Sequence, residues 1–337
     1  MSGVVRWGII GAGQIADVVM APAMLASPHA DLVAVCKRDR QAAQAFADRH
    51  GARRAYDDYR AVLADPDVDA VYVATTPQRH LEEVLAAAAA GKHVLCEKPL
   101  AMTVEEAERM RGVCAGAGVQ LMVCFYQRFS ARNQKIKELL EQGAIGRVVE
   151  ARWSSSSRQS QRVEAWRQDP AQSGGGPLMD VGVHCIDLMR YLLGEPGQVV
   201  AMTDTLAGTY PVEDTSTVMF RLAGGAHAVI STHWSALDPN QTRSSRLEIM
   251  GTEGSIISTP LQDKFSRGTL TVVTRDGEEV LQFDRSTHEV VLAEFAAALE
   301  EGRPPSVNGD DGVAAQRILE AAYRSSATGA LVRLGTG

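Results

Sequence analysis

The sequence lacks the features that mark several classes of protein. Its five cysteines are scattered, odd in number and without a Cys-x-x-Cys pair. This argues against a disulfide scaffold or a zinc ribbon, and for reduced thiols in the cytoplasm. No stretch approaches about 18 consecutive apolar residues, so we expect no membrane span. The N-terminus runs directly into an expected strand, so we expect no signal peptide there. The formal net charge of −7 gives no reason to expect a broad nucleic-acid-binding surface.

The sequence has instead the composition of a globular protein. Its 337 residues, 45% hydrophobic and 22% charged, suit one large domain or two ordinary ones. In residues 1–125, apolar strand patterns alternate with helical patterns. We expect strands at 4–10, 31–36, 68–75, 92–96 and 119–124, and helices at 14–26, 40–50, 81–90 and 103–116, where Pro22 could interrupt the first helix. This alternation predicts an α/β Rossmann domain with a doubly wound parallel sheet over 1–125.

The alternation of strand and helix patterns ends after Phe125. We expect a helix at 132–142, a strand at 147–153, a serine-rich loop at 154–162, strands at 198–206, 215–223, 226–235, 244–250, 254–258, 269–274 and 279–284, and closing helices at 287–301 and 310–328. Strands at hairpin spacing are typical of antiparallel sheets. The pattern predicts an α+β domain over 126–337, with a large, mostly antiparallel open sheet. An open sheet with one apolar face would normally be covered by a partner.

A glycine-rich turn follows the first expected strand. Gly11-x-Gly13-x-x-Ala16 has the form of the dinucleotide-binding fingerprint. Gly11 allows the tight turn, Gly13 leaves the backbone open to a pyrophosphate, and Ala16 lets the helix pack closely. The free N–H groups at the helix start, at Gln14 and Ile15, are expected to face the phosphates.

The second expected strand ends where such proteins read the cofactor's ribose. This chain has Lys37-Arg38 there, followed by Asp39. Two cations suit the 2′-phosphate of NADP(H), and the planar Arg38 could stack on adenine. Asp39 could instead serve NAD(H), and both cations could be solvated surface residues. We expect NADP(H), with NAD(H) as the alternative.

Two further motifs follow expected strands, at the edge where open α/β sheets bind ligands. One is Thr75-Thr76-Pro77, with His80 in the same loop, and the other is Glu97-Lys98-Pro99. Lys98 could donate to a substrate oxygen and stabilise developing alkoxide charge. The alternative is a surface lysine paired with Glu97.

The second half carries an acid and a histidine four residues apart, Asp180 and His184. On a helix they share one face. An aspartate can orient a histidine and raise its basicity, which suits a general base that takes a proton from an alcohol. The pair could also be structural, or form a metal site with Asp187, although no Cys or His ligand motif is nearby. We expect no metal.

Other side chains are weaker candidates for the site. Trp166-Arg167 could bring an aromatic face and a cation to a ligand, with an exposed arginine on a packed tryptophan as the alternative. We also expect substrate contacts from Tyr126, Arg128 and Trp234, and from loop 154–165 and strand ends at 231–240, including Asp238 and Asn240.

In this order, the motifs resemble the Gfo/Idh/MocA oxidoreductase family of glucose–fructose oxidoreductase and inositol dehydrogenase. The resemblance rests on Gly8–Ala16, on Ala74–Pro77 with His80, on Glu97–Leu100, on Gly174–Asp187 and on the closing Ala321–Ser325. It implies a Rossmann domain, a second domain whose open sheet often forms the oligomer interface, and hydride transfer between NAD(P) and a sugar, polyol or related compound.

The resemblance also assigns residues. The lysine of the family's Glu-Lys-Pro motif falls on Lys98, in a Lys98–Pro99 bond that is often cis. The acid and the histidine of its second domain fall on Asp180 and His184. Trp166-Arg167 resembles a pair that in some members reaches the cofactor. Many members carry an acid where this chain has Lys37, a departure that supports NADP(H).

We therefore expect an NADP(H)-preferring sugar or polyol oxidoreductase that forms a homodimer or homotetramer through the C-terminal sheet. Two other functions are compatible with the motifs. One is a sugar-modifying enzyme that uses tightly bound NAD transiently, and the other is a cofactor-binding sensor without chemistry. The sequence does not identify the sugar or the direction of the reaction.

Overall fold

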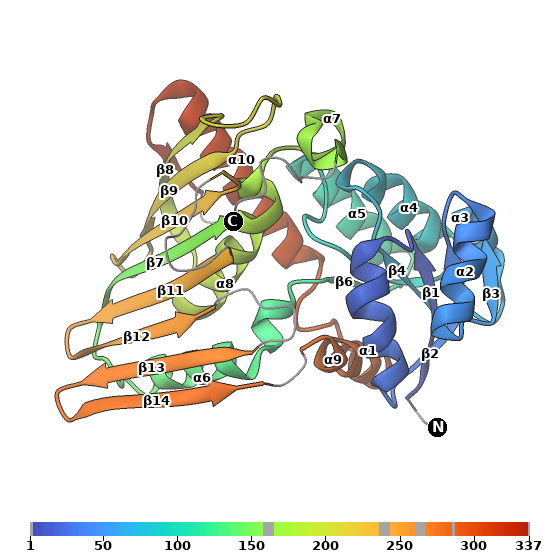
Figure 1. Cartoon of the computed structure of the whole chain (residues 1–337), viewed down its shortest axis with the longest axis horizontal. Coiled ribbons are helices and arrows are strands. Elements are labelled where there is room, and N and C mark those ends of the chain that lie inside the picture. The colour runs from blue at the N-terminus through green and yellow to red at the C-terminus, as the bar shows by residue number, and fades with distance from the viewer. Residues whose placement is uncertain (1–2, 158–164, 236–242, 261–266, 285–286, 336–337) are drawn as a thin grey trace. The chain divides into compact units, whose positions relative to one another are not determined.

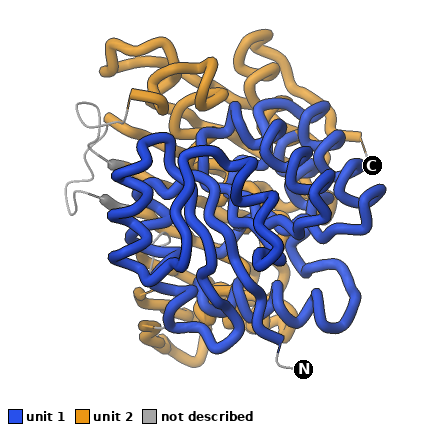
Figure 2. The backbone as a smooth tube through the Cα atoms, turned by 90° about the vertical axis from the view of Figure 1, so that its right-hand side faces the viewer, with its two compact units in different colours: residues 1–126, 288–316 blue, residues 127–287, 317–337 orange. Residues whose placement is uncertain are grey.

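The computed structural model describes residues 3–157, 165–235, 243–260, 267–284 and 287–335. They form two compact units, coloured separately in Figure 2. The first unit comprises residues 1–126 and 288–316, and the second comprises 127–287 and 317–337. The sequence predicted a second domain running unbroken from residue 126. Residues 288–316 instead return to the first unit.

The first unit contains a six-stranded sheet in the order β3-β2-β1-β4-β5-β6. All neighbouring strands are parallel, which confirms the α/β Rossmann fold. The strands are β1 (Val5–Ile10), β2 (Ala30–Cys36), β3 (Arg54–Tyr56), β4 (Ala70–Val73), β5 (His93–Cys96) and β6 (Leu121–Val123). The strand order reverses between β1 and β4, and ligands of such sheets bind at the carboxyl ends of the strands beside this point.

Helices connect these strands. They are η1 (Ala16–Met20), α1 (Ala21–Ala26), α2 (Arg40–His50), α3 (Tyr59–Ala64), α4 (Pro77–Ala89), α5 (Val104–Gly116) and the returning α9 (His288–Glu301). Trp7 of β1 is fully buried, and its ring centroid lies 5.1 Å from that of Phe295 in α9. This aromatic contact explains why α9, which lies beside α1 in Figure 1, belongs to the first unit.

Pro22 does not interrupt the first helix. The chain is helical from residue 14 to residue 26, and the π-helical turn η1 lies just before Pro22. In regular α geometry the proline ring clashes with the carbonyl group four residues earlier. The wider π turn falls on the residues where that clash would arise.

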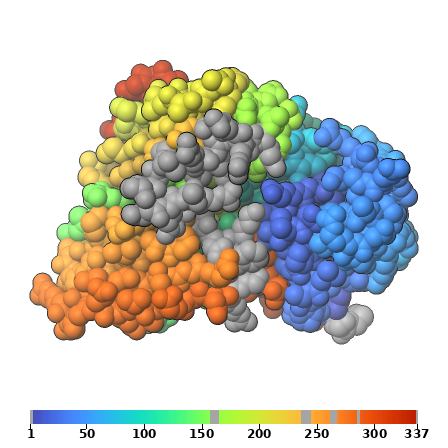
Figure 3. Space-filling model, in the orientation of Figure 1, coloured from blue at the N-terminus to red at the C-terminus, as the bar shows by residue number. Residues whose placement is uncertain are grey.

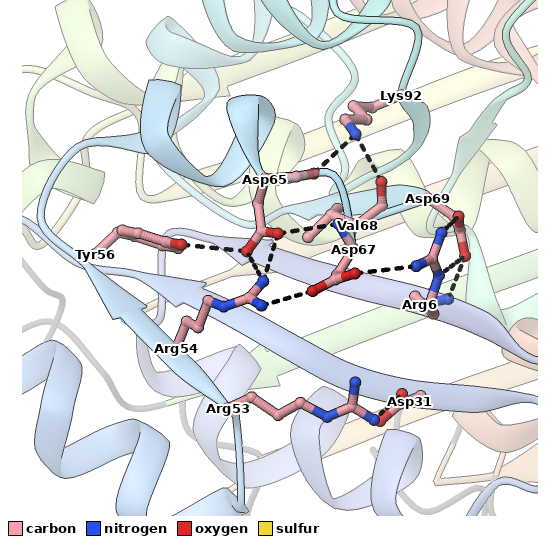
Figure 4. Close-up of polar contacts among 10 residues, drawn as sticks. All are labelled: Arg6, Asp31, Arg53, Arg54, Tyr56, Asp65, Asp67, Val68, Asp69 and Lys92. Carbon is pink, nitrogen blue, oxygen red and sulfur yellow. Dashed lines mark hydrogen bonds and ion pairs between the residues drawn. The ribbon is translucent and has the colours of Figure 1, made fainter.

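Ion pairs join the amino ends of the strands, opposite the ligand-binding edge (Figure 4). Arg54 of β3 donates to Asp65 at 2.5 and 2.7 Å and to Asp67 at 2.6 Å. Arg6 of β1 donates to Asp69, just before β4, at 2.6 and 2.9 Å. These contacts stabilise the edge of the sheet that does not face the expected cofactor.

The second unit contains a nine-stranded sheet in the order β14-β13-β12-β11-β7-β10-β9-β8-β15. Among the strand pairs that the structure describes in this sheet, only β7 and β10 are parallel, so the predicted mostly antiparallel sheet is confirmed. The strands are β7 (Val148–Ser157), β8 (Pro196–Asp204), β9 (Thr215–Leu222), β10 (His227–His233), β11 (Arg243–Gly251), β12 (Gly254–Thr259), β13 (Gly268–Thr274), β14 (Gly277–Phe283) and β15 (Val332–Arg333).

Strand β7 is longer than predicted. Residues 154–157, which the sequence placed in a serine-rich loop, continue the strand. Ser154 pairs with Ser231 of β10 on one side and with Arg246 of β11 on the other. Two neighbouring strands satisfy the backbone of this segment, and their pairing outweighs its polar composition.

Helices cover one face of this sheet. Helix α8 (Val183–Leu193) packs on β10 and α6 (Ala131–Glu141) on β13, behind the sheet in Figure 1. Shorter elements are η2 (Tyr126–Phe129), η3 (Ala165–Gln168), α7 (Pro170–Ser173) and η4 (Leu178–Gly182), and α10 (Gly309–Thr328) contains the boundary at residue 316. The hairpin of β13 and β14, orange in Figure 3, lies at the surface, with β14 at the sheet edge. Within the described ranges, no helix is long and apolar enough to cross a membrane.

Candidate active site

The fingerprint turn follows β1 directly. Gly11 has φ +87°, a conformation that residues with a Cβ rarely adopt. A Cβ at Gly11 would lie 2.7 Å from Cγ2 of Thr75. The N–H groups of Gly11 and Ala12 donate to the carbonyl oxygen of Cys36 at 3.2 and 3.0 Å. Ala16 is fully buried, as its predicted packing role requires.

Gly13 differs from Gly11 because its surroundings are open. A Cβ there would meet only the Gly11 carbonyl oxygen, at 3.9 Å. The packing of the protein itself therefore leaves room for a side chain at position 13. A phosphate that approached the backbone there would require a glycine. Gln14 is exposed and Ile15 half-buried at the start of the helix, where backbone N–H groups have no partner within the helix. This cradle fits the pyrophosphate of a dinucleotide.

The position expected to read the ribose lies after β2. Lys37 and Arg38 are both exposed. Asp39 is the N-cap of α2, and its carboxylate accepts the N–H of Ala42 at 2.8 Å. One carboxylate oxygen of Asp39 thus stabilises the helix start, while the two cations face solvent.

A polar cluster follows β4. The Thr75 hydroxyl donates to Glu83 at 2.5 Å, and Arg79 donates to the same carboxylate at 2.8 Å. Burial raises the pKa of Glu83, although the Thr75 hydroxyl and Arg79 oppose that shift. Thr76 precedes Pro77, which begins α4. Glu83 therefore fixes Thr75 at the ligand-binding edge, a contact that the sequence motifs did not reveal.

His80 joins two loops at this edge. Its side chain is buried, with Nδ1 3.0 Å from the carbonyl oxygen of Pro99 and Nε2 3.3 Å from that of Thr75. Burial lowers the pKa of His80, which favours the neutral ring. These contacts tie the loop after β4 to the loop after β5, and a contact between His80 and a cofactor stays a prediction.

Lys98 follows β5 at the same edge and is half-buried. The preceding Glu97 accepts the Tyr72 hydroxyl at 2.6 Å and the Lys98 N–H at 3.2 Å. Burial raises the pKa of Tyr72 well above its ordinary value, so Tyr72 stays a donor to Glu97. The Lys98–Pro99 peptide bond is cis, as the resemblance implied. These contacts fix the backbone on both sides of Lys98.

The acid and the histidine lie in the second unit, where the structure places both on one helical segment. Asp180 is in the π-helical turn η4, and His184 is in the first turn of α8. π-Helical turns occur frequently at functional sites. His184 is 6% exposed, while Asp180 is half-buried. The imidazole is therefore largely shielded from solvent.

Trp166 and Arg167 join Asp180 in one cluster. The Arg167 Nε donates to Asp180 at 3.2 Å, and the guanidinium carbon lies 4.2 Å from the centre of the Trp166 ring. The arginine thus combines an ion pair with a cation–π contact. The structure brings these three predicted residues together.

The predicted substrate residues have packing or ionic partners. Arg128 forms a two-pronged ion pair with the fully buried Asp187, with contacts of 2.5 to 3.1 Å. Tyr126 lies 4.7 Å from His288, centroid to centroid. Trp234 is 2% exposed and packs against Tyr210. Substrate contacts by these side chains stay predictions, and Asp238, Asn240 and residues 158–164 lie outside the described residues.

Asp187 pairs with Arg128, which opposes a role as a metal ligand. In the part of the chain that the structure describes, no group of three or more His, Cys, Asp or Glu side chains could hold a metal ion. The predicted residues offer an ammonium group, a carboxylate and an imidazole, in addition to the dinucleotide cradle.

Comparisons with known proteins match both units. Residues 5–125 match the family described as "Oxidoreductase family, NAD-binding Rossmann fold", and residues 133–257 match the "GFO/IDH/MocA C-terminal domain". The chain is 34% identical to 1,5-anhydro-D-fructose reductase of Ensifer adhaerens, over 98% of this chain and 99% of that protein. It is also 34% identical to D-xylose 1-dehydrogenase (NADP(+)) 2 of Haloferax volcanii, over 97% and 99%.

A solved structure is similar over the same extent. Levoglucosan dehydrogenase in complex with NADH and levoglucosan has a TM-score of 0.88 and 27% identity, over 98% of this chain and all of that one. The motifs, the two sheets and these matches all indicate the same family, along almost the whole chain.

Proposed function

Because the chain belongs to the Gfo/Idh/MocA oxidoreductase family, we propose that it transfers a hydride between NADP(H) and a CH–OH or C=O group of a sugar or polyol. The observation that carries this proposal is the open cradle at Gly13, on the same sheet edge as Lys98. The relatives support the substrate class, since their names include an anhydrofructose reductase, a xylose dehydrogenase and a levoglucosan dehydrogenase.

The residues of the first unit would hold the cofactor. Gly11, Gly13 and the N–H groups at Gln14 and Ile15 would bind the pyrophosphate, and the loops with Thr75–Pro77 and Glu97 would line the rest of the edge. When bound, the nicotinamide supplies or accepts the hydride. Trp166 and Arg167 would complete the cofactor contacts from the second unit.

Three side chains would handle the substrate oxygen. In oxidation, His184 takes the hydroxyl proton, with Asp180 orienting the imidazole and favouring its protonated form. The ammonium group of Lys98 donates to the same oxygen and stabilises the negative charge that builds on it. In reduction, His184 returns the proton to the oxygen. The proposal requires both units to present these groups to one substrate.

The preference for NADP(H) over NAD(H) rests on Lys37 and Arg38. Both are exposed at the end of β2, while Asp39 caps α2. A 2′-phosphate would form ion pairs with both cations. A ribose hydroxyl would instead have to share the carboxylate of Asp39 with the Ala42 N–H. Among the relatives, the xylose dehydrogenase is named for NADP(+), and the levoglucosan dehydrogenase structure holds NADH.

A panel of sugars and polyols, assayed in both directions with each cofactor, tests the reaction and the preference together. The absorbance of the reduced nicotinamide reports turnover. We expect turnover of at least one sugar or polyol, with a higher kcat/KM for NADP(H) than for NAD(H). No turnover across the panel would contradict the reaction, and a clear preference for NAD(H) would contradict the assignment of Lys37 and Arg38.

We also propose a homodimer or homotetramer that covers the open face of the second sheet. Val200 of β8 faces Met219 of β9 in the strand register, and these residues are 37% and 53% exposed. Met202, on the same side of β8, is 71% exposed. Apolar side chains gathered on one sheet face favour a protein partner. Light scattering should give a mass at least twice the 36.2 kDa of one chain, and a monomeric mass would contradict this proposal.

A further inference from the structure

A buried carboxylate caps the segment that carries Asp180 and His184. Glu213, just before β9, is 9% exposed. It accepts the N–H of Gly176 at 2.7 Å and that of Leu178 at 3.1 Å. The residue between these two donors is Pro177, which has no N–H. The Glu213 carboxylate therefore accepts the backbone donors on both sides of Pro177.

Gly176 connects Glu213 to Asp180. Its N–H donates to Glu213, and its carbonyl oxygen accepts the N–H of Asp180 at 3.0 Å. Two successive hydrogen bonds thus join the carboxylate to the backbone of the proposed acid. A negative charge at a helix N-terminus is also favourable, because the first N–H groups carry partial positive charge.

A tyrosine from the end of the chain holds the same carboxylate. The Tyr323 hydroxyl donates to Glu213 at 3.0 Å. Burial raises the pKa of Tyr323 well above its ordinary value, so the hydroxyl stays a donor. Burial also raises the pKa of Glu213, although the Gly176 and Leu178 N–H groups and the Tyr323 hydroxyl oppose that shift. Removing one donor would leave a buried carboxylate undersatisfied.

The glycines of this turn make the contact possible. A Cβ on Gly176 would lie 1.8 Å from the carbonyl oxygen of Glu213, and one on Gly175 would lie 2.2 Å from the Tyr323 hydroxyl oxygen. Neither position has room for a larger residue. Gly175 and Gly176 are therefore required by the approach of Glu213 and Tyr323, a role that the sequence pattern did not indicate.

The backbone beside Glu213 is fixed to the sheet. The N–H of Asp214 donates to the carbonyl oxygen of Asp204 in β8 at 3.0 Å. The carbonyl oxygen of Asp214 accepts the N–H of Trp234, just after β10, at 2.9 Å. The residue next to Glu213 is therefore held between the end of β8 and the end of β10.

We propose that Glu213, held by Tyr323, is a positioning residue that sets the placement of Asp180 and His184. This inference rests on the proposed function, because its kinetic readout is hydride transfer. Glu213 acts through the backbone of Gly176 and Leu178. Its loss should therefore lower turnover much more than it lowers cofactor affinity.

The test compares Glu213→Ala, Glu213→Gln and Tyr323→Phe in the full chain. We expect Glu213→Ala to lower kcat about 100-fold, the effect of displacing catalytic groups by about 1 Å, with KM for the cofactor changed about twofold or less. Glu213→Gln keeps one acceptor oxygen and should restore part of kcat, and Tyr323→Phe should lower kcat about three- to tenfold. Folded fractions from circular dichroism normalise each rate.

Hydrogen exchange of the peptide spanning 176–184 gives a readout independent of activity. We expect faster exchange there in Tyr323→Phe and in both Glu213 variants. The matched control is Glu294→Gln, a half-buried carboxylate of α9 that accepts the Ser306 N–H at 2.9 Å and pairs with Arg303 at 2.7 Å. It should leave exchange at 176–184 unchanged.

Unchanged kcat and unchanged exchange in Glu213→Gln and Tyr323→Phe would overturn the proposal. If Glu213→Ala does not fold, Tyr323→Phe decides the question, because it removes a single hydroxyl. A wild-type protein without turnover would contradict the proposed function, and exchange at 176–184 would still decide whether Glu213 and Tyr323 hold the helix. Equal losses of kcat and cofactor affinity would also contradict a positioning role.

Discussion

Lys98 lies between two residues with fixed positions. Glu97 is bonded to the Tyr72 hydroxyl, and the carbonyl oxygen of Pro99 lies against His80. The ammonium group therefore extends from a rigid backbone, as a donor to a reacting oxygen requires. We predict that Lys98→Met lowers kcat about 100- to 1000-fold, the usual cost of losing one such donor. Steady-state kinetics and a cofactor binding titration measure the two effects separately, and cofactor affinity should stay nearly unchanged.

Lys92→Met is the matched control for that prediction. Lys92 precedes β5, at the opposite end of the same strand, and donates to the carbonyl oxygens of Asp65 and Val68 at 3.0 and 2.7 Å. The control should keep wild-type kcat, since it lies away from the ligand-binding edge. Near-wild-type turnover of Lys98→Met would remove this lysine from the mechanism.

The residues that follow strands were predictable, whereas their supporting partners were not. A glycine turn or a Lys-Pro pair after a strand is a local pattern, and the fold places it at the carboxyl edge. Glu83 and Glu213 are single acids that bind residues 8 and 37 positions away. No spacing in the sequence links them to Thr75 or Gly176, because the tertiary fold alone brings those groups together.

Both helical segments that follow the chemistry-bearing glycines contain a π turn. η1 follows Gly11 and Gly13, and η4 follows Gly174–Gly176. The helix predicted at 14–26 was correct as a helix, but apolar periodicity does not distinguish a π turn from an α turn over five residues. The wider turn changes which side chains share a face, so the four-residue spacing of Asp180 and His184 did not fix their geometry.

At the opposite edge of the first sheet, the ion pairs give stability. Asp65 is 4% exposed. Burial alone would raise its pKa, but Arg54, the Asp67 N–H and the Tyr56 hydroxyl together lower it below the ordinary value. Because its folded-state pKa is lowered, the Asp65 carboxylate stabilises the protein at pH values above the unfolded-state pKa of about 3.9. That stabilisation is lost as the pH falls through the folded-state pKa.

We predict that Asp65→Asn lowers the free energy of unfolding at neutral pH by about 2 kcal/mol, the order of a hydrogen bond to a charged group. The difference from wild type should shrink as the pH falls below about 4, where the unfolded-state carboxylate becomes protonated, and further as the pH falls through the lower folded-state pKa. Urea unfolding across pH measures both. Asp67→Asn, which removes a 43% exposed partner of the same Arg54, should cost less. An equal loss at every pH would contradict a role for the charge of Asp65.

Strand β7 shows that local composition does not always predict where a strand ends. Its four terminal serines suggest a loop by composition, yet they lie between β10 and β11. A central strand gains hydrogen bonds from two neighbours, and strand propensities span only about 1 kcal/mol and change between edge and central strands. Only the sheet order reveals that position.

For the chain as a whole, the sequence predicted both fold classes correctly but not the return of residues 288–316 to the first unit. The helix 287–301 was predicted as an element, yet nothing local assigned it to a domain. Trp7 and Phe295 are far apart in the sequence, and their contact is a property of the packed unit. The spacing of apolar residues shows which face of a helix is apolar. It does not show which distant aromatic residue packs against that face.

The central claim is that the chain moves a hydride between NADP(H) and a sugar or polyol carbon. The most direct measurement uses NADPH with deuterium at both C4 positions of the nicotinamide, with the carbonyl form of a substrate found in the panel. Mass spectrometry and NMR of the product should locate one deuterium on the carbon that bears the new hydroxyl group, and Lys98→Met should slow its appearance. A product that carries no deuterium, or deuterium exchanged from solvent instead of from the cofactor, would contradict the account.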